Sequence, residues 1–126
     1  MLSDYVGRRV YVAAPYSHPD SAVVDWRMEQ VNRVTAALIE AGIIAFSPLT
    51  YSHGELDRLT GYKFDWLKFD LEFLALCDLL LVVMLPGWDE SVGVKRERKV
   101  AYDRGLAYIQ ASPEIIIACC EEMKEV

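Results

Sequence analysis

Residues 70–97 read DLEFLALCDLLLVVMLPGWDESVGVKRE, and this stretch decides the fold that we expect for the chain. Its centre, residues 79–84, is an unbroken apolar run, which is typical of a strand covered on both faces. The P-G pair at 86–87 ends the strand, and the D-E-S run at 89–91 is of the kind that begins a helix. The stretch therefore predicts the end of one helix, a buried strand, a loop and the start of another helix.

Two acidic residues in this stretch occupy positions that packing alone would give to apolar side chains. Asp70 falls inside the apolar stripe of a helix predicted over residues 62–77, and Glu97 lies one turn from both Gly93 and Val100. A carboxylate costs several kcal/mol to bury unpaired, so each acid needs a partner, a raised pKa or a cleft to face. Because one acid precedes the strand and the other follows it, both could face one cleft.

The same residues also allow ordinary structural explanations. Asp70 could be a buried acid paired with Lys95 or Arg96, and Glu97 could form a salt bridge within a solvated K-R-E-R-K helix face. Trp88 could stack on a flat ring of a bound ligand or, equally well, pack on its own helix.

Apolar strands and helices alternate along the rest of the chain. Strands are expected at residues 9–14, 43–46, 79–84 and 106–109. Helices are expected from Asp20 or Ser21 to Gly42, over 62–77, from Ser91 to Gly105 and over 113–124, with residues 47–61 mostly irregular. This order predicts the α/β class: a doubly wound, flavodoxin-like or Rossmann-like parallel sheet of about four to five strands with helices on both faces.

Length and composition indicate a single globular domain, residues 1–126. Hydrophobic residues make up 53% of the 126 positions and charged residues 25%, which excludes a disordered chain. The net charge of −6 argues against general affinity for nucleic acid. Three cysteines without metal-ligand spacing fit a reduced, cytoplasmic protein. We expect no membrane association, because no signal peptide and no apolar run of spanning length is visible.

Open sheets of this kind bind ligands beyond the carboxyl ends of their strands. Here those ends are expected to bring several polar side chains toward the two acids: Tyr11, Tyr16, His18, Tyr51, His53 and Ser91. The two histidines have no third ligand at suitable spacing, so no metal site is expected. The sequence predicts one cleft in one domain.

The sequence resembles the nucleoside 2-deoxyribosyltransferases and the related 2′-deoxynucleoside 5′-monophosphate N-glycosidases. The resemblance rests on Tyr11 in V-Y-V-A-A-P, Asp70 in D-L-E-F-L-A-L-C-D, the apolar strand, and S-V-G-V-K-R-E ending at Glu97. It extends over most of the chain. The first loop, A-A-P-Y-S-H-P, departs from the family pattern, because it lacks the glycines that are frequent there and the arginine that hydrolase members can carry.

The resemblance implies a role for each matching residue. Glu97 would be the nucleophile that attacks the anomeric carbon, Asp70 its partner in proton transfer, and Tyr11 an orienting residue. Substrate would be held by residues of the first loop and of the loop before the last acid: Pro15, Tyr16, Ser17, His18, Trp88, Asp89, Ser91 and Gly93. Relatives that use free nucleosides tend to carry Asp at the position of Ser91, whereas nucleotide hydrolases carry Ser, which suits a phosphate at a helix start.

The chemistry sets the protonation states that we expect of the two acids. A nucleophilic Glu97 must be ionised, held so by a hydrogen bond from Tyr11 or by the helix start, whereas Asp70 in its apolar stripe should have a raised pKa and donate a proton.

The first hypothesis is therefore cleavage of an N-glycosidic bond, or deoxyribosyl transfer, on a nucleoside or nucleoside 5′-monophosphate. No cofactor is expected, and the resemblance implies a homo-oligomer, a dimer or larger. One alternative is a non-catalytic nucleotide-binding or sensor module that uses the same cleft. Another is a small structural or assembly protein without a ligand.

Overall fold

The chain forms a four-stranded, all-parallel sheet in the order β2-β1-β3-β4. A computed structural model describes residues 1–52, 55–61 and 64–124. The strands are β1 (Arg9–Ala13), β2 (Ile44–Phe46), β3 (Leu79–Val83) and β4 (Ala107–Ala111). Tyr11 lies at the centre of the sheet, in register with Phe46 on one side and Leu80 on the other. The predicted doubly wound α/β fold is confirmed, with four strands.

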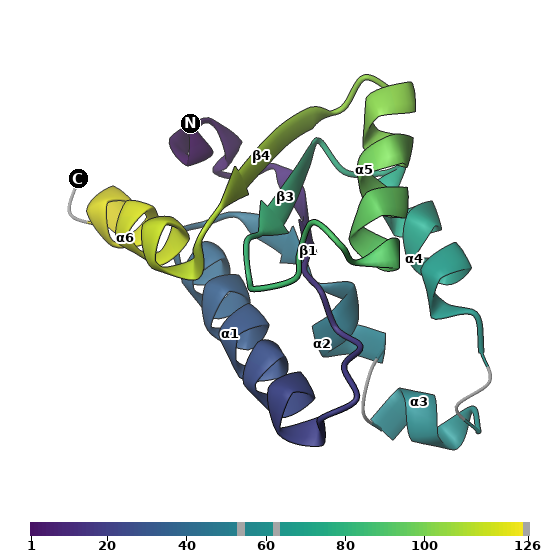
Figure 1. Ribbon diagram of the computed structural model, residues 1–126. Coiled ribbons are helices and arrows are strands. Elements are labelled where there is room, and N and C mark those ends of the chain that lie inside the picture. The colour runs from purple at the N-terminus through teal and green to yellow at the C-terminus, as the bar shows by residue number, and fades with distance from the viewer. Residues whose placement is uncertain (53–54, 62–63, 125–126) are drawn as a thin grey trace.

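Helices cover both faces of this sheet (Figure 1). A long helix, α1 (Ser21–Glu40), and the last helix, α6 (Pro113–Lys124), lie on one face, whereas α4 (Trp66–Leu74) and α5 (Val92–Asp103) lie on the other. A short 3-10 helix, η1 (Leu2–Tyr5), precedes β1, and two short helices, α2 (Pro48–Ser52) and α3 (Glu55–Leu59), follow β2.

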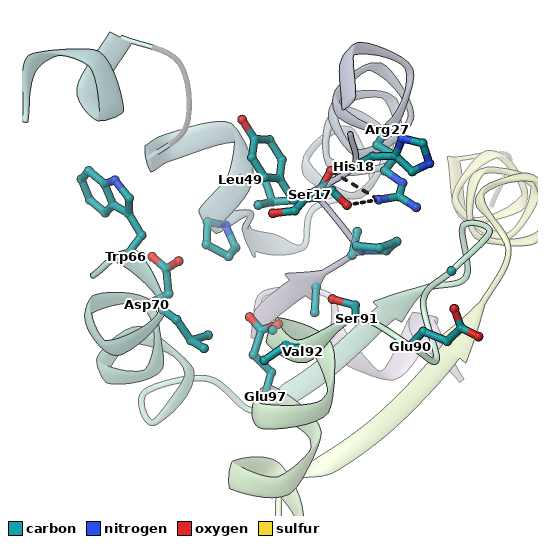
Figure 2. A pocket seen from close by; sticks show the side chains of 18 residues that line it. Ser17, His18, Arg27, Leu49, Trp66, Asp70, Glu90, Ser91, Val92 and Glu97 are labelled. Carbon is teal, nitrogen blue, oxygen red and sulfur yellow. Dashed lines mark hydrogen bonds between the residues drawn. The ribbon is translucent and has the colours of Figure 1, made fainter. Parts of the chain in front are cut away.

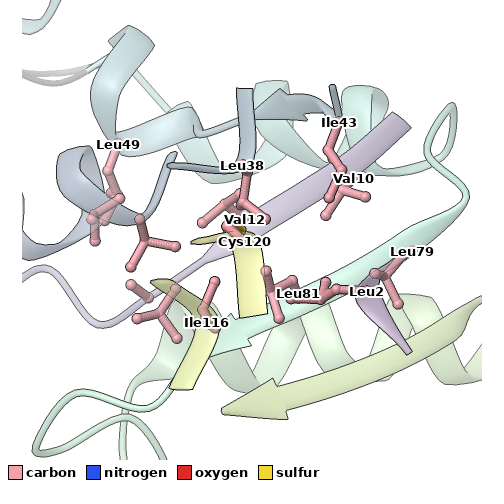
Figure 3. Close-up of a cluster of buried hydrophobic side chains, with 14 of the residues drawn as sticks. Leu2, Val10, Val12, Leu38, Ile43, Leu49, Leu79, Leu81, Ile116 and Cys120 are labelled. Carbon is pink, nitrogen blue, oxygen red and sulfur yellow. The ribbon is translucent and has the colours of Figure 1, made fainter. Parts of the chain in front are cut away.

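Alternate residues of the two central strands form two separate apolar cores. Val10 and Val12 of β1 and Leu79 and Leu81 of β3 pack with α1 and α6 (Figure 3). The intervening residues of these strands pack with side chains of α4 and α5: Tyr11, Ala13, Leu80, Val82, Leu74, Val94 and Ala101. β3 is buried along its whole length, as its apolar run predicts.

Several boundaries differ from the sequence-based expectations. The helix expected over residues 62–77 begins only at Trp66, because the Asp65 carboxylate accepts a hydrogen bond from the Lys68 amide and caps the helix there. Tyr62 lies outside the described residues. The segment expected to be mostly irregular contains α2 and α3. The fourth strand runs from Ala107, one residue later than expected, and continues to Ala111.

The strand order places a crevice between β1 and β3. From β1 the chain passes to β2 on one side, and from β3 it passes to β4 on the other, so the connections after these two strands diverge. The caps of both following helices were expected correctly: Asp20 caps α1 through the Ala22 amide, and Ser91 caps α5 through the Val94 amide. In the described residues, no helix has the length and apolar character needed to cross a membrane.

Candidate functional site

A cavity of about 580 Å³ lies where the carboxyl ends of β1 and β3 meet the starts of α1, α4 and α5. Figure 2 shows its side chains, which come from both diverging loops and from the helices on either side. Most of the residues expected to bind substrate line it: Pro15, Tyr16, Ser17, His18, Ser91 and Gly93.

Asp70 and Glu97 line the same cavity. Asp70 reaches it from α4 and Glu97 from α5, and Figure 2 shows the two carboxyl groups on facing sides of the space. Their exposed fractions are 5% and 6%. Within the described part of the chain neither acid forms an ion pair, so the alternatives of an Asp70 pair with Lys95 or Arg96 and of a solvated Glu97 are wrong.

Tyr11 lies beneath the two acids, fully buried in the centre of the sheet. Its hydroxyl interacts with Glu97 without reaching the geometry of an ordinary hydrogen bond, and in the described residues it has no other partner. The Oδ1 atom of Asp70 is likewise buried without a partner there. Burial, followed by the nearby Glu97 carboxyl, raises the pKa of Tyr11, so this phenol stays protonated.

Burial also makes both carboxyl groups reluctant to ionise. It raises the pKa of Asp70 to about 7. It raises the pKa of Glu97 to about 8, which Tyr11 partly counteracts and the Asp70 charge reinforces. The expected raised pKa of Asp70 is confirmed. The expectation that Glu97 stays ionised is wrong at neutral pH, because burial outweighs the help from Tyr11.

The loop side of the cavity offers polar groups and a helix start. Ser91 Oγ accepts a hydrogen bond from the Val94 amide at 3.3 Å, so its hydroxyl caps α5 at the cavity wall. Across from it, His18 Nδ1 accepts from the Asp20 amide at 3.0 Å, which leaves Nε2 of the neutral ring as the N–H donor.

Four residues expected near the acids or the substrate do not line the cavity: Tyr11, which is buried in the sheet, Trp88, Asp89 and Tyr51. Trp88 packs against the α4–α5 core, and the Arg98 guanidinium lies 5.5 Å from the centre of its ring. Packing on its own helix is thus the correct reading of Trp88. Tyr51 instead stacks on Phe69. His53 lies outside the described residues.

Sequence reasoning missed Arg27, which lines the cavity from α1. The side chain is 7% exposed and donates to the carbonyl oxygens of Ser17 at 2.8 Å and Pro86 at 3.0 Å. It lies in the apolar stripe of α1, between Val24 and Val31, so the test that singled out Asp70 and Glu97 would also have found it.

No group of three or more His, Cys, Asp or Glu side chains within the described ranges could hold a metal ion. None of the curated proteins compared with the chain matches it. One protein family matches over residues 8–111, which include the strands β1 to β4, the helices α1 to α5 and both buried acids. The chain therefore belongs to the family described as Domain of unknown function (DUF1937).

Proposed function

We propose that this protein cleaves the N-glycosidic bond of a nucleoside or nucleoside 5′-monophosphate. The observation that carries the proposal is the pair of buried carboxyl groups, Asp70 and Glu97, that face one cavity. Two carboxyl groups suffice for such a reaction, because one can trap the oxocarbenium-like sugar and the other can protonate the leaving base. The cavity volume of about 580 Å³ falls within the range of small-molecule sites.

In the proposed mechanism, the ionised Glu97 attacks the anomeric carbon while the bond from that carbon to the base nitrogen breaks. Asp70 gives its proton to the departing base and is left as a carboxylate. Before the attack, the Tyr11 hydroxyl donates a hydrogen bond to the ionised Glu97 carboxylate beside it and so stabilises its charge.

The glycosyl ester on Glu97 is resolved by a second nucleophile. Water attacks the anomeric carbon, Asp70 takes its proton, and Glu97 leaves as a carboxylate, which completes hydrolysis. If a second base attacks instead, the same steps complete a deoxyribosyl transfer. Both outcomes return the acids to their starting states.

The reactive form holds one proton on the two acids together. With pKa values of about 7 for Asp70 and about 8 for Glu97, the singly protonated pair is most abundant between those values, with its proton mostly on Glu97. The reactive form is the less populated arrangement of the same pair, with the proton on Asp70 and the charge on Glu97, and its share of the pair does not change with pH. The rate should therefore rise and fall with pH around this interval.

The loop side of the cavity favours the 5′-monophosphate within this substrate class. Arg27 brings a positive charge to the cavity, and the first turn of α5 points its free amides toward the same region from Ser91. In a chain of net charge −6, this local polarity is suited to an anionic group.

The test is incubation with a panel of nucleosides and their 5′-monophosphates, with release of free base followed by chromatography. Glu97→Gln should lower kcat by at least about a thousandfold, because it removes the nucleophile. Glu90→Gln is the matched control, since Glu90 also lines the cavity but is exposed. Equal base release by wild type and Glu97→Gln would overturn the proposal.

A binding module is the second candidate, favoured by the raised pKa of Glu97, about 8, which keeps this carboxyl group mostly neutral at pH 7. A nucleotide that raises the melting temperature without losing its base, in both the wild type and Glu97→Gln, would select this function.

The proposal also includes an oligomeric state and a cellular location for the protein. A homo-oligomer is supported by exposed apolar side chains around α3 and α4, at Leu59, Phe64 and Leu76. Light scattering at several concentrations tests it. A reducing, cytoplasmic location is supported by the unpaired Cys77, Cys119 and Cys120.

A further inference from the structure

Arg27 joins three parts of the chain around the cavity. Its guanidinium projects from α1 and donates through Nη1 to the carbonyl oxygens of Ser17, at 2.8 Å, and Tyr16, at 3.4 Å. Through Nη2 it donates to the carbonyl oxygen of Pro86 at 3.0 Å. Tyr16 and Ser17 belong to the loop after β1, where Figure 2 shows Arg27 bonded, and Pro86 belongs to the loop after β3, so one side chain links both diverging loops.

In the described residues, carbonyl oxygens and not a carboxylate compensate the positive charge of Arg27. The side chain is 7% exposed, and among residues 1–52, 55–61 and 64–124 it contacts no carboxylate at ion-pair distance. A buried cation is costly unless polar groups compensate it, and here the compensating groups are backbone carbonyls of the two loops. Guanidinium suits this position, since its planar fork can reach several acceptors at once.

The backbone of the second loop is shaped around the same group. Gly87 has a φ of +89°, and a Cβ atom added to it would lie 3.0 Å from Arg27 Nη2. Any other residue at position 87 would strain the backbone and also press on the guanidinium. The backbone of the loop after β3 therefore packs directly against the guanidinium of Arg27.

We propose that Arg27 is a positioning residue that ties the loop after β1 and the loop after β3 into one unit, so that they become ordered together over the cavity. It thereby holds Ser17 and His18 opposite Ser91. Its effect on turnover rests on the proposed function, whereas its effect on loop order does not.

The first test is amide hydrogen exchange of full-length variants. In Arg27→Met, exchange should rise at least about tenfold in both loops, residues 14–20 and 84–91, because each loses its anchor. Arg33→Met is the matched control on the same helix, since Arg33 is exposed and, as far as the described residues go, pairs with Glu29 alone, at 3.1 Å. A response in one loop alone, or in neither, would overturn the proposal.

A pair of glycine variants keeps the test decisive if Arg27→Met does not fold. Gly87→Ala displaces the guanidinium and strains φ, whereas Gly105→Ala strains a φ of +68° with no atom within 4 Å of the new methyl group. Gly87→Ala should therefore raise exchange in the loop after β1, which position 87 reaches through Arg27, and Gly105→Ala should not. Equal exchange of that loop in both variants would contradict the link.

The kinetic test uses the substrate found in the panel. Arg27→Lys keeps the charge but cannot span three carbonyls, so KM should rise at least about tenfold while kcat falls less. An unchanged KM, with both loops mobile, would overturn the positioning role. If no substrate is turned over by the wild type, the proposed function fails, and the exchange measurements still decide whether Arg27 couples the loops.

Discussion

The Tyr11 hydroxyl is buried beside the proposed nucleophile and, in the described residues, forms no hydrogen bond of ordinary geometry. Such a group costs free energy in the folded protein unless a charged partner uses it. Glu97 is that partner only when it is ionised, because a neutral carboxyl gains less from the phenol. Tyr11 thus contributes little to stability while Glu97 is neutral, and more to the ionised state of Glu97 that attack requires.

Tyr11→Phe separates these two contributions. Its free energy of unfolding should stay within about 1 kcal/mol of wild type, or rise, because no made hydrogen bond is lost. Its kcat/KM should fall at least about tenfold, since a hydrogen bond to a charged group contributes about 1.5–3 kcal/mol. Urea denaturation and steady-state kinetics measure the two effects. A large loss of stability with unchanged kinetics would show that Tyr11 acts only in the core.

At the scale of elements, the start of α5 serves both the fold and the cavity. Ser91 caps the helix through the Val94 amide, and the same turn faces the region proposed to hold a phosphate. A substitution that keeps the cap while reversing the local charge preference can distinguish these roles.

Ser91→Asp is that substitution, because Asp caps helices about as well as Ser. Stability at pH 7 should change by less than about 1 kcal/mol. The KM for a nucleoside 5′-monophosphate should rise at least about tenfold relative to the KM for the matching nucleoside, since the new carboxylate repels the phosphate. Ser91→Ala is the control: it loses the cap without adding charge. An equal change in KM for both substrates would contradict a phosphate at this helix start.

The strands and long helices could be predicted because each is long enough for its pattern of apolar residues to be recognised in the sequence. β3 is apolar throughout, and α1 repeats its stripe over twenty residues. The short helices α2 and α3 could not be predicted, since five residues complete little more than one turn. Local contacts start and hold them instead: Ser47 Oγ accepts from the Thr50 amide, and Arg58 pairs with Glu55.

The site residues that could be predicted are those whose charge stands out in an otherwise apolar stripe of a helix. A carboxylate in an apolar stripe is conspicuous, and this identified Asp70 and Glu97. The same test would also mark Arg27, but it is a weaker signal for an arginine, because the long stem can pack on apolar surface while the charge reaches water. Glu90 lines the cavity and Trp88, two residues earlier, does not. This depends on how the loop turns, and periodic patterns in the sequence do not predict the conformation of a loop.

Across the whole molecule, the two acids link stability to pH. Their pKa values in the folded state, about 7 for Asp70 and about 8 for Glu97, lie above the ordinary values of 3.8 and 4.5. Between these limits the unfolded chain binds fewer protons than the folded one, so stability must fall as pH rises. The contribution of these groups is fully present near pH 4 and is lost above pH 8.

Glu97→Gln should reduce this dependence. At pH 9 the variant should be more stable than wild type by on the order of 1–3 kcal/mol, because an amide needs no proton to remain neutral in the cavity. At pH 4 the two should differ much less. Urea denaturation across this range measures the effect, with Glu90→Gln as the exposed control. Parallel pH curves for wild type and Glu97→Gln would show that Glu97 is not buried as a neutral acid.

The facing carboxyl groups of Asp70 and Glu97 also hold protons at neutral pH that bound ligands can displace. A ligand that is held by an ionised Glu97, or that takes the proton of Asp70, must exchange protons with the solvent as it enters. The heat of binding will then include the ionisation enthalpy of the buffer, and the apparent affinity will change with pH even for a ligand that does not itself titrate. Binding to this protein is, in calorimetric terms, a reaction with three participants: protein, ligand and hydrogen ion.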